Sequence, residues 1–164
     1  MALETQVAAV AKPGKYLTFA LGGEVYGLEI LKVQEINGIV DTTRVPRTPE
    51  YVRGVINLRG RVIPVIDLRA KFEMEQVANT ERTCIIVCQL EKEDGHATVG
   101  VIVDDVSEVL TIVEDQISPP PEFGDGVDFI IGVGRLDDQV VILLDIQKVL
   151  AGDETMVLPG MDSD

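Results

Sequence analysis

The segment from Tyr51 to Leu68, Y-V-R-G-V-I-N-L-R-G-R-V-I-P-V-I-D-L, returns 78 residues later as F-I-I-G-V-G-R-L-D-D-Q-V-V-I-L-L-D-I, from Phe129 to Ile146. Each copy has two aliphatic runs around a polar turn, which is the pattern of a β-hairpin. The gapless match pairs Gly54 with Gly132, Val55 with Val133, Leu58 with Leu136, Val62 with Val140 and Asp67 with Asp145. The sequence therefore predicts one hairpin used twice.

A second repeated block lies upstream, at an offset of 73 residues. It pairs Gly27 with Gly100, Val33 with Val106 and Glu35 with Glu108. Together the blocks define a first repeat over 24–75 and a second over 97–150, within a single domain spanning 15–150. The segments 1–14 and 152–164 are predicted to be flexible tails.

The spacing of strands and turns predicts an all-β fold. About ten short strands recur with turn signals every 8–12 residues, a pattern typical of sandwiches and small barrels. An open five-stranded sheet would expose its edges, so we expect each copy to curl into a small barrel, with short helices and a C-terminal helix over 146–150. Leu28–Ile36 is expected to be a strand, one helical turn and another strand, and Pro64 to lie at an edge or a bulge.

Composition narrows the functional classes. The 164 residues carry a formal net charge of −14, which argues against binding to nucleic acid or to an anionic membrane surface. No signal peptide and no apolar run of ~20 residues is visible, so we expect a cytoplasmic protein without direct membrane insertion. Cys84 and Cys88 are predicted to share one face of a strand as free thiols, too far apart for a disulfide. The basic residues cluster in one stretch: Arg44, Arg47, Arg53, Arg59, Arg61, Arg69 and Lys71.

The candidates for chemistry are few. His96, the single histidine, follows a turn and has no nucleophile nearby in sequence. The acidic pairs Asp104-Asp105 and Asp137-Asp138 do not have the geometry of paired catalytic carboxylates, because adjacent strand residues face opposite ways. We therefore predict no catalytic residue, no metal site and no cofactor. Asp67 and Asp145 are expected to cap the turn or helix that follows each hairpin.

The two hairpin tips differ in charge. The first reads Asn57-Leu58-Arg59-Gly60-Arg61 and the second Arg135-Leu136-Asp137-Asp138-Gln139. A structural turn needs neither sign of charge, so an arginine tip on a duplicated scaffold suggests contact with an acidic partner. A solvated turn arginine remains the alternative.

The sequence resembles the CheW family, the coupling proteins of bacterial chemotaxis. The resemblance rests on Y-G-L-E-I-L-K-V-Q-E-I from Tyr26, G-V-I-N-L-R-G-R-V-I-P-V-I-D-L-R from Gly54, and V-G-V-I-V-D-D-V-S-E-V-L from Val99. It implies a single domain made of two intertwined five-stranded barrels of the Src-homology type, packed around a shared hydrophobic core. It also implies an adaptor, not an enzyme, that joins methyl-accepting receptors to the histidine kinase CheA in membrane-associated arrays.

The resemblance also implies two binding surfaces. The receptor's cytoplasmic helical tip would lie in the groove between the two barrels, lined by Asn57, Leu58, Arg59 and Gly60. Gly54 would support the strand, and Val103 and Val109 would face them from the second copy. The regulatory domain of CheA would contact Leu17, Ile30 and Val33, with Glu35 beside them. Three other hypotheses stay open: a coupler for another sensory circuit such as twitching motility or surface sensing, a small-ligand sensor with a pocket between the barrels, and a hydrolase that uses the aspartate pairs.

Overall fold

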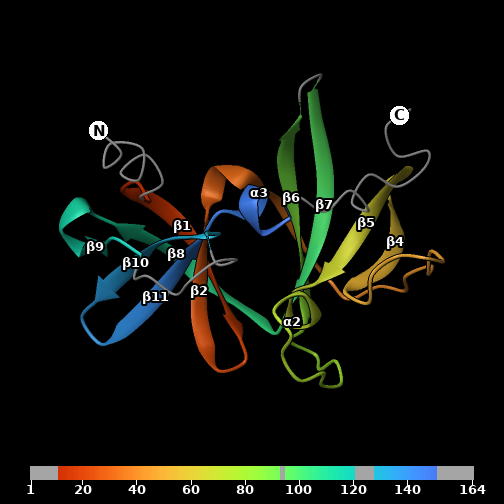
Figure 1. Ribbon diagram of the computed structural model, residues 1–164, viewed down its shortest axis with the longest axis horizontal. Coiled ribbons are helices and arrows are strands. Elements are labelled where there is room, and N and C mark those ends of the chain that lie inside the picture. The colour runs from red at the N-terminus through yellow and green to blue at the C-terminus, as the bar shows by residue number, and fades with distance from the viewer. Residues whose placement is uncertain (1–10, 93–94, 121–127, 151–164) are drawn as a thin grey trace.

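Strands form most of the computed structural model, which describes residues 11–92, 95–120 and 128–150 (Figure 1). The eleven strands of this described part are β1 (Gly14–Leu21), β2 (Glu24–Glu29), β3 (Val33–Gly38), β4 (Val52–Leu58), β5 (Arg61–Asp67), β6 (Cys84–Lys92), β7 (Gly95–Val103), β8 (Asp105–Ile112), β9 (Ile117–Ser118), β10 (Ile130–Leu136) and β11 (Gln139–Leu144). The short helices are η1 (Ile30–Lys32), α2 (Leu68–Lys71), η2 (Glu114–Gln116) and α3 (Ile146–Val149). The all-β prediction is confirmed.

The strands form two sheets that lie side by side (Figure 1). Sheet A has the order β8-β1-β2-β11-β10-β9, and sheet B has the order β3-β6-β7-β5-β4. Each sheet contains one parallel pair, β2 with β11 and β7 with β5, among antiparallel neighbours. The end strands of each order, β8 and β9 or β3 and β4, are not hydrogen-bonded to each other.

The sheets do not coincide with the sequence repeats. Sheet A takes β1 and β2 from the first half of the chain and its other four strands from the second. Sheet B takes β3, β4 and β5 from the first half and β6 and β7 from the second. Neither sheet is therefore built from one copy alone, and the expected count of five strands holds for sheet B only. The copies exchange strands, and sheet A gains a sixth strand, β9.

The chain crosses between the sheets at only two places in the described residues. The first crossover is η1, which joins β2 of sheet A to β3 of sheet B. This confirms the strand, helical turn and strand expected over Leu28–Ile36. The second crossover is Asp104 alone, between the end of β7 and the start of β8. The repeat offset of 73 places Leu31 of η1 opposite Asp104.

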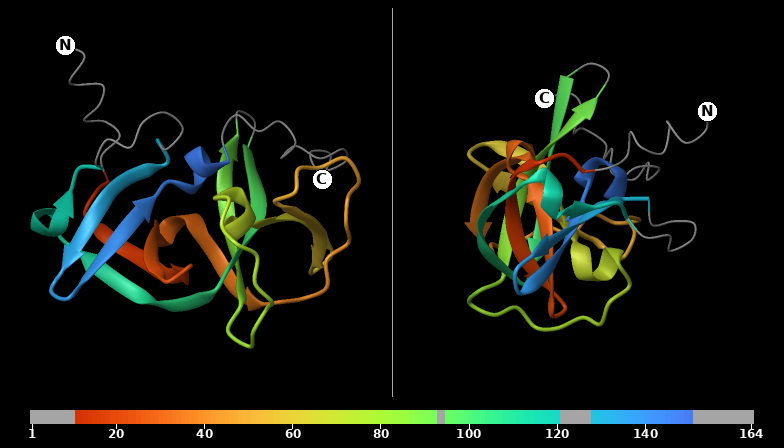
Figure 2. Two further views of the ribbon diagram at one scale, coloured as in Figure 1. Left: turned by 60° about the horizontal axis from the view of Figure 1, so that its bottom comes forward. Right: turned by 90° about the vertical axis from the view of Figure 1, so that its left-hand side faces the viewer.

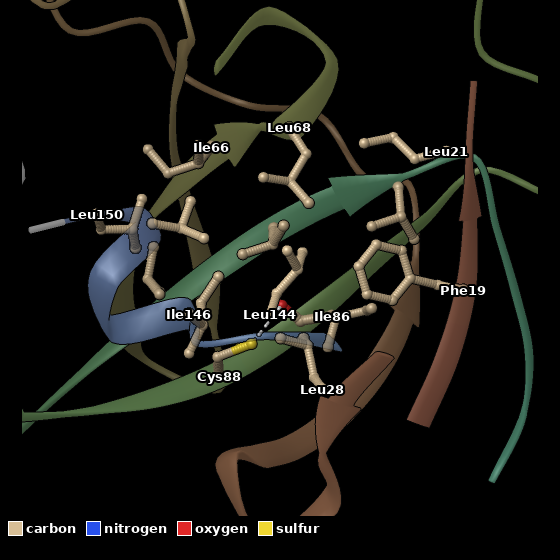
Figure 3. Packing of buried hydrophobic residues seen from close by; sticks show 14 of the residues in the cluster. Phe19, Leu21, Leu28, Ile66, Leu68, Ile86, Cys88, Leu144, Ile146 and Leu150 are labelled. Atoms are coloured by element: carbon tan, nitrogen blue, oxygen red, sulfur yellow. Dashed lines mark hydrogen bonds between the residues drawn. The ribbon is translucent and has the colours of Figure 1, made fainter. Parts of the chain in front are cut away.

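A shared hydrophobic core holds the sheets together (Figure 3). Sheet A contributes side chains such as Phe19 and Leu28, sheet B contributes Ile86 and Cys88, and both short α-helices add theirs. Burying one such aliphatic or aromatic side chain stabilises the fold by roughly 1.5–3 kcal/mol. Two smaller clusters lie apart from this core, one built from sheet A residues and one from sheet B residues. The shared core implied by the family resemblance is thus present.

The repeated aspartates cap the repeated helices, as predicted. The Asp67 carboxylate accepts hydrogen bonds from the backbone N–H groups of Arg69 and Ala70. Asp145 does the same for the N–H groups of Gln147 and Lys148. Each aspartate satisfies N–H groups that a helix start leaves unpaired.

Pro64 lies in an internal strand, so the expected edge position was wrong. It sits opposite Val55 of β4, one residue before the segment of β5 that pairs with β7. The backbone N–H and C=O of Val55 bond to Thr43 on the other side of β4. In an antiparallel pair this places Val55 and Pro64 opposite each other without mutual hydrogen bonds. Proline is tolerated here because no strand needs its missing N–H.

The predicted N-terminal tail, residues 1–14, is shorter than expected, and the chain enters sheet A at β1 (Figure 2). Ala11 is buried, its N–H donates to the Ile131 carbonyl at 2.7 Å, and β1 already begins at Gly14. Residues 11–14 therefore belong to the fold. The remainder of both predicted tails, residues 1–10 and 152–164, lies outside the described residues.

Candidate functional site

A pocket of about 440 Å³ lies between β3 and β4, the two end strands of sheet B. We call it the open seam, and its lining residues are Asn37, Gly38, Ile39, Val40, Asp41, Thr43, Val55, Ile56, Asn57 and Leu58. Ile39, Ile56 and Leu58 also belong to the small hydrophobic cluster of sheet B. The seam is thus an entrance to an apolar interior, lined at its rim by polar groups, as in many binding pockets.

One end of the open seam is fixed by a backbone bridge at Thr43. The Thr43 N–H donates to the Val55 carbonyl at 2.9 Å, and the Val55 N–H donates to the Thr43 carbonyl at 2.8 Å. Gly54 makes this approach possible. Its φ is +139°, and a Cβ at this position would overlap the Thr43 carbonyl. Only glycine combines this backbone conformation with this contact.

An ion pair lies beside the other end of the open seam, next to the lining residues Asn37 and Leu58. Arg59 Nη2 lies 2.7 Å from Glu35 Oε1, and Asn37 Nδ2 donates to Glu35 Oε2 at 2.7 Å. These contacts with Arg59, and then with Asn37, hold the pKa of Glu35 below its usual value. The Arg59 side chain is 71% exposed, so the pair adds little to folding stability and leaves the guanidinium open to a partner.

The Arg59 turn has a specific geometry. Leu58 pairs with Arg61, and the two residues between them, Arg59 and Gly60, have φ of +53° and +85°. Two consecutive positive φ values define a type I′ hairpin turn. The Gly60 N–H donates to the Asn57 side-chain oxygen at 2.9 Å. A non-glycine residue at positive φ is uncommon, and the turn holds Arg59 there beside Glu35.

The equivalent seam of sheet A is filled. Ile112 is fully buried, and its Cδ1 lies 3.1 Å from where a Cβ of Gly134 would be. The repeat places Ile39 opposite Ile112 and Ile56 opposite Gly134, so sheet B has a large side chain where sheet A has none. Strand β9 also pairs with β10 here, and Arg135 donates to Ser118 Oγ at 2.7 Å. Gly134 leaves room for Ile112 to fill the seam of sheet A. In sheet B the larger Ile56 occupies the equivalent position, and the seam stays open.

The acidic tip on sheet A is also a different turn. Neither Asp137 nor Asp138 has a positive φ. The charge difference between the tips predicted from sequence therefore comes with a difference in backbone geometry. The basic stretch, by contrast, is not one free surface: Arg53, Arg59 and Arg69 each pair with a carboxylate.

The described residues offer little for catalysis or metal binding. They contain no group of three or more His, Cys, Asp or Glu side chains placed to hold a metal ion. Asp104 is held by Arg69, and Asp105 by Arg82, so this pair is occupied in ion pairs. Both cysteines are free, and burial raises the pKa of Cys88 to about 12. Within the described residues no helix is long and apolar enough to cross a membrane.

Comparison with known proteins places the chain in a family. Residues 15–154 match the family model of the CheW-like domain. The chain belongs to the CheW-like domain family. The chemotaxis protein CheW of Klebsiella aerogenes is 41% identical over 163 residues, covering 98% of this chain and 96% of that protein.

Two further relatives of this CheW-like chain extend the comparison. Protein FrzA of Myxococcus xanthus is 30% identical over 154 residues, covering 92% of this chain and 94% of that protein. The crystal structure of the scaffolding protein TtCheW from Thermoanaerobacter tengcongensis has a TM-score of 0.79 and 35% identity, covering 89% of this chain and 98% of that one.

The receptor surface expected from the CheW resemblance is only partly assembled. The structure brings Asn57, Leu58, Arg59 and Gly60 together at the rim of the open seam, with Gly54 behind them. Val109 is 48% exposed but lies on β8 of sheet A, away from the seam (Figure 1). Val103 has no exposed area and lies in the shared core. Its assignment as a contact residue is therefore corrected.

The expected kinase surface of this CheW-like chain needs a similar correction. Leu17 is 2% exposed and packs in the shared core, so its side chain cannot form a surface contact here. Ile30 and Val33 are half-buried against the same core in η1 and β3. Glu35 contacts Arg59, which joins the two surfaces that the sequence treated as separate.

The repeat relates further exposed residues that the sequence reading of this CheW-like chain missed. Six of the eight exposed large hydrophobic residues in the described part of the chain form three pairs at the repeat offsets: Ile36 with Val109, Val40 with Val113, and Val62 with Val140. Applying the repeat offset of 73 residues to Val109, which was predicted as a contact residue, would have identified Ile36. Leu31 was also missed, and it is 90% exposed in η1. Its signal was weaker, because it fits neither the period of a strand nor that of a helix.

Proposed function

We propose that this protein is a cytoplasmic chemotaxis adaptor that joins the tips of methyl-accepting receptors to the regulatory domain of the histidine kinase CheA. It would be recruited to membrane-associated receptor arrays, where receptor state controls kinase activity. Membership of the CheW-like family and likeness to a scaffolding protein support this role. The open seam, an apolar entrance with Arg59 and Glu35 on its rim, is the observation that carries the proposal.

The open seam suits a helical receptor tip. Helix-in-groove recognition uses apolar anchors on one helix face, with polar groups at the edge of the groove. Ile39, Ile56 and Leu58 would receive an apolar anchor, and the exposed Val40 would extend the contact. Arg59 presents several N–H donors, which suit an acidic or amide side chain on the receptor.

The first crossover suits the kinase contact. Leu31 projects from η1 with 90% of its surface exposed, and the half-buried Ile30 and Val33 flank it. Burying this exposed leucine in a pocket of the partner would contribute roughly 1.5–3 kcal/mol. We expect each isolated contact to have a micromolar Kd, which corresponds to a binding free energy of about −8 kcal/mol. In the array, several such contacts would act together and raise the overall affinity through multivalency. A nanomolar affinity for one isolated receptor fragment would contradict this expectation.

The decisive experiment captures partners with the protein as bait, from lysate and from detergent-solubilised membranes, and identifies them by mass spectrometry. The proposal expects both CheA and methyl-accepting receptors, with receptors selectively lost in Arg59→Glu. Arg82→Glu is the matched control, because Arg82 is 74% exposed and, like Arg59, pairs with a carboxylate, that of Asp105. Capture of neither partner, or equal loss of receptors in both variants, would overturn the assignment.

A second variant pair tests the kinase surface. Leu31→Asp should lose the CheA regulatory domain and keep receptor binding, measured by calorimetry with each purified partner. Val77→Asp is the control, since Val77 is 52% exposed outside the helices and strands. If Leu31→Asp leaves both affinities unchanged, the kinase contact lies elsewhere.

The competing hypotheses have distinct outcomes in the same assays. A coupler for twitching motility or surface sensing would capture receptors and a kinase of that pathway. A small-ligand sensor is expected to have its pocket between the two barrels, whereas the open seam lies within sheet B. A ligand-dependent rise in melting temperature, with no protein partner captured, would favour the sensor.

A further inference from the structure

The two crossovers between the sheets occupy repeat-related positions but are built differently. Leu31 and Asp104 are equivalent by the 73-residue offset. The Leu31 crossover is a three-residue helical turn whose central side chain is almost fully exposed. The Asp104 crossover is one residue long, and its side chain is held by several hydrogen bonds. Hinges between packed bodies are often a few residues at the ends of elements, which both crossovers are.

Asp104 forms a clasp that ties the crossover to both sheets. Arg69, in the helix that follows β5 of sheet B, donates from Nε to Asp104 Oδ1 at 2.8 Å and from Nη2 to Oδ2 at 2.7 Å. Gly22, in the turn between β1 and β2 of sheet A, donates its N–H to Asp104 Oδ2 at 2.9 Å. The Asp104 N–H donates to the Ala20 carbonyl at 3.1 Å. We call these contacts the Asp104 clasp.

The Asp104 clasp is directional, whereas the shared core is not. A bidentate arginine–carboxylate pair fixes both the distance and the angle of its partners. Apolar burial is nearly independent of direction, and an aliphatic core can accept more than one packing angle. The clasp is also sheltered, with 17% of the Arg69 side chain and 29% of the Asp104 side chain exposed. Arg69 is anchored further by donating from Nη1 to the Glu75 carbonyl at 2.8 Å.

The repeat-related contact on the other side is neutral and does not hold a crossover. Gln147, equivalent to Arg69 at the offset of 78, exchanges two hydrogen bonds with the backbone of Glu91 on β6, at 2.9 and 3.0 Å. This contact joins α3 to sheet B, but it leaves Leu31 free. The Asp104 crossover is therefore held by a bidentate ion pair, whereas the η1 crossover has one longer ion pair, from Lys32 Nζ to Glu91 Oε2 at 3.9 Å.

We propose that the Asp104 clasp sets the angle between the two sheets, and that the crossover at Asp104 is a hinge which the clasp keeps locked. Releasing Asp104 would let the sheets reorient about this point while each sheet keeps its strands. The angle fixes how the open seam of sheet B is presented relative to the exposed residues of sheet A. The clasp is thus a positioning device, with no direct contact to a partner.

The test measures the distance between the sheets. Spin labels at Val62→Cys on β5 and Val140→Cys on β11 report this distance, because both positions are exposed and each lies beside a hairpin turn. Cys84→Ser removes the half-buried thiol, and the buried Cys88 stays. Pulsed electron resonance should give one narrow distance distribution for the parent. Asp104→Ala and Arg69→Met should each shift or broaden it, with circular dichroism unchanged.

Two controls keep the proposal falsifiable. Asp105→Asn breaks the exposed Arg82 pair at the neighbouring residue and should leave the distribution narrow. Gln147→Ala breaks the neutral contact and should broaden the distribution less than Asp104→Ala does. Unchanged distributions in both clasp variants would show that packing alone sets the angle and would overturn the proposal. So would failure of both clasp variants to fold, since the clasp would then be needed for the sheets themselves.

Discussion

The two seams of this molecule come from the same sequence repeat, yet only the one in sheet B is open. In sheet A, Gly134 lets Ile112 pack into the gap, and β9 covers the outside. In sheet B, Ile56 takes the place of Gly134, and a pocket remains. The charged rim formed by Arg59 and Glu35 occurs on the open seam. The difference teaches that a few side chains decide which copy of a duplicated scaffold can accept a partner.

The largest expected difference in the free energy of unfolding is between alanine variants of two repeat-related glycines, Gly54 in sheet B and Gly132 in sheet A. Gly54→Ala should cost roughly 3–4 kcal/mol, because the new Cβ meets the Thr43 backbone and the φ of +139° is strained. Gly132→Ala should cost about 1 kcal/mol, because its nearest neighbour is the Ala11 side chain at 3.0 Å. Urea unfolding of both variants provides the comparison, and equal losses would mean that the Thr43 bridge is not what fixes the open seam.

A smaller difference is expected between the two helix caps. Asp145→Ala should cost about 1 kcal/mol, the usual value for a lost N-cap. Asp67→Ala should cost roughly 2–4 kcal/mol, because Asp67 also pairs with Arg53 and is nearly fully buried. The double variant Arg53→Met/Asp67→Ala serves as the control. If it is no more stable than Asp67→Ala, the unpaired arginine is not the source of the extra loss.

The Asp104 clasp and the repeat-related Gln147 contact should differ in their response to acid. The hydrogen bonds from Arg69 lower the pKa of Asp104 below its ordinary value of 3.8. Burial partly opposes this shift, and the hydrogen bond from the Gly22 N–H adds to it. A lowered folded-state pKa gives stability that is present above the unfolded-state value and lost as pH falls through the folded-state value. Stability from the Asp104 clasp should therefore fade below about pH 4, while the Gln147 contact is unaffected. Urea midpoints between pH 5 and 2.5 should fall less steeply in Asp104→Ala than in the parent.

The smallest expected effect on stability is at the hairpin tips. Arg59→Glu should leave the melting temperature close to that of the parent, because the side chain is mostly exposed. Combining it with Glu35→Arg restores opposite charges and should recover part of any lost receptor affinity. A variant that unfolds would show instead that Arg59 holds the turn, and that the charge difference between the tips is structural.

The local elements followed from local sequence signals, whereas the way they assemble did not. The Arg59-Gly60 turn, the capping aspartates and the helical turn at η1 were all predicted, since each depends on a few adjacent residues. The sequence predicted intertwined subdomains but not which strands the repeats exchange, because the pattern within each strand is the same whichever partner it pairs with. Pro64 was placed wrongly for the same reason.

The candidate site was predicted in part. The arginine tip was identified because its charge breaks the symmetry of the repeat. Burial could not be foreseen for Leu17 and Val103, since an aliphatic residue in a strand looks the same whether it faces a core or a partner. The contact between Arg59 and Glu35 was also missed, because it joins residues 24 positions apart through the curl of sheet B.

The exchange of strands has a consequence for how the chain is made. Sheet B is complete once residue 103 has left the ribosome, whereas sheet A must wait for β11, which ends at Leu144. Strands β1 and β2 are translated before β8 and β11, their partners in sheet A, so the hydrogen bond from Thr18 to Glu108 joins residues 90 positions apart. Non-local pairing of this kind slows folding and leaves strand edges uncovered in the meantime. The outer edges of the β1–β2 hairpin should therefore stay uncovered until β8 and β11 have been translated.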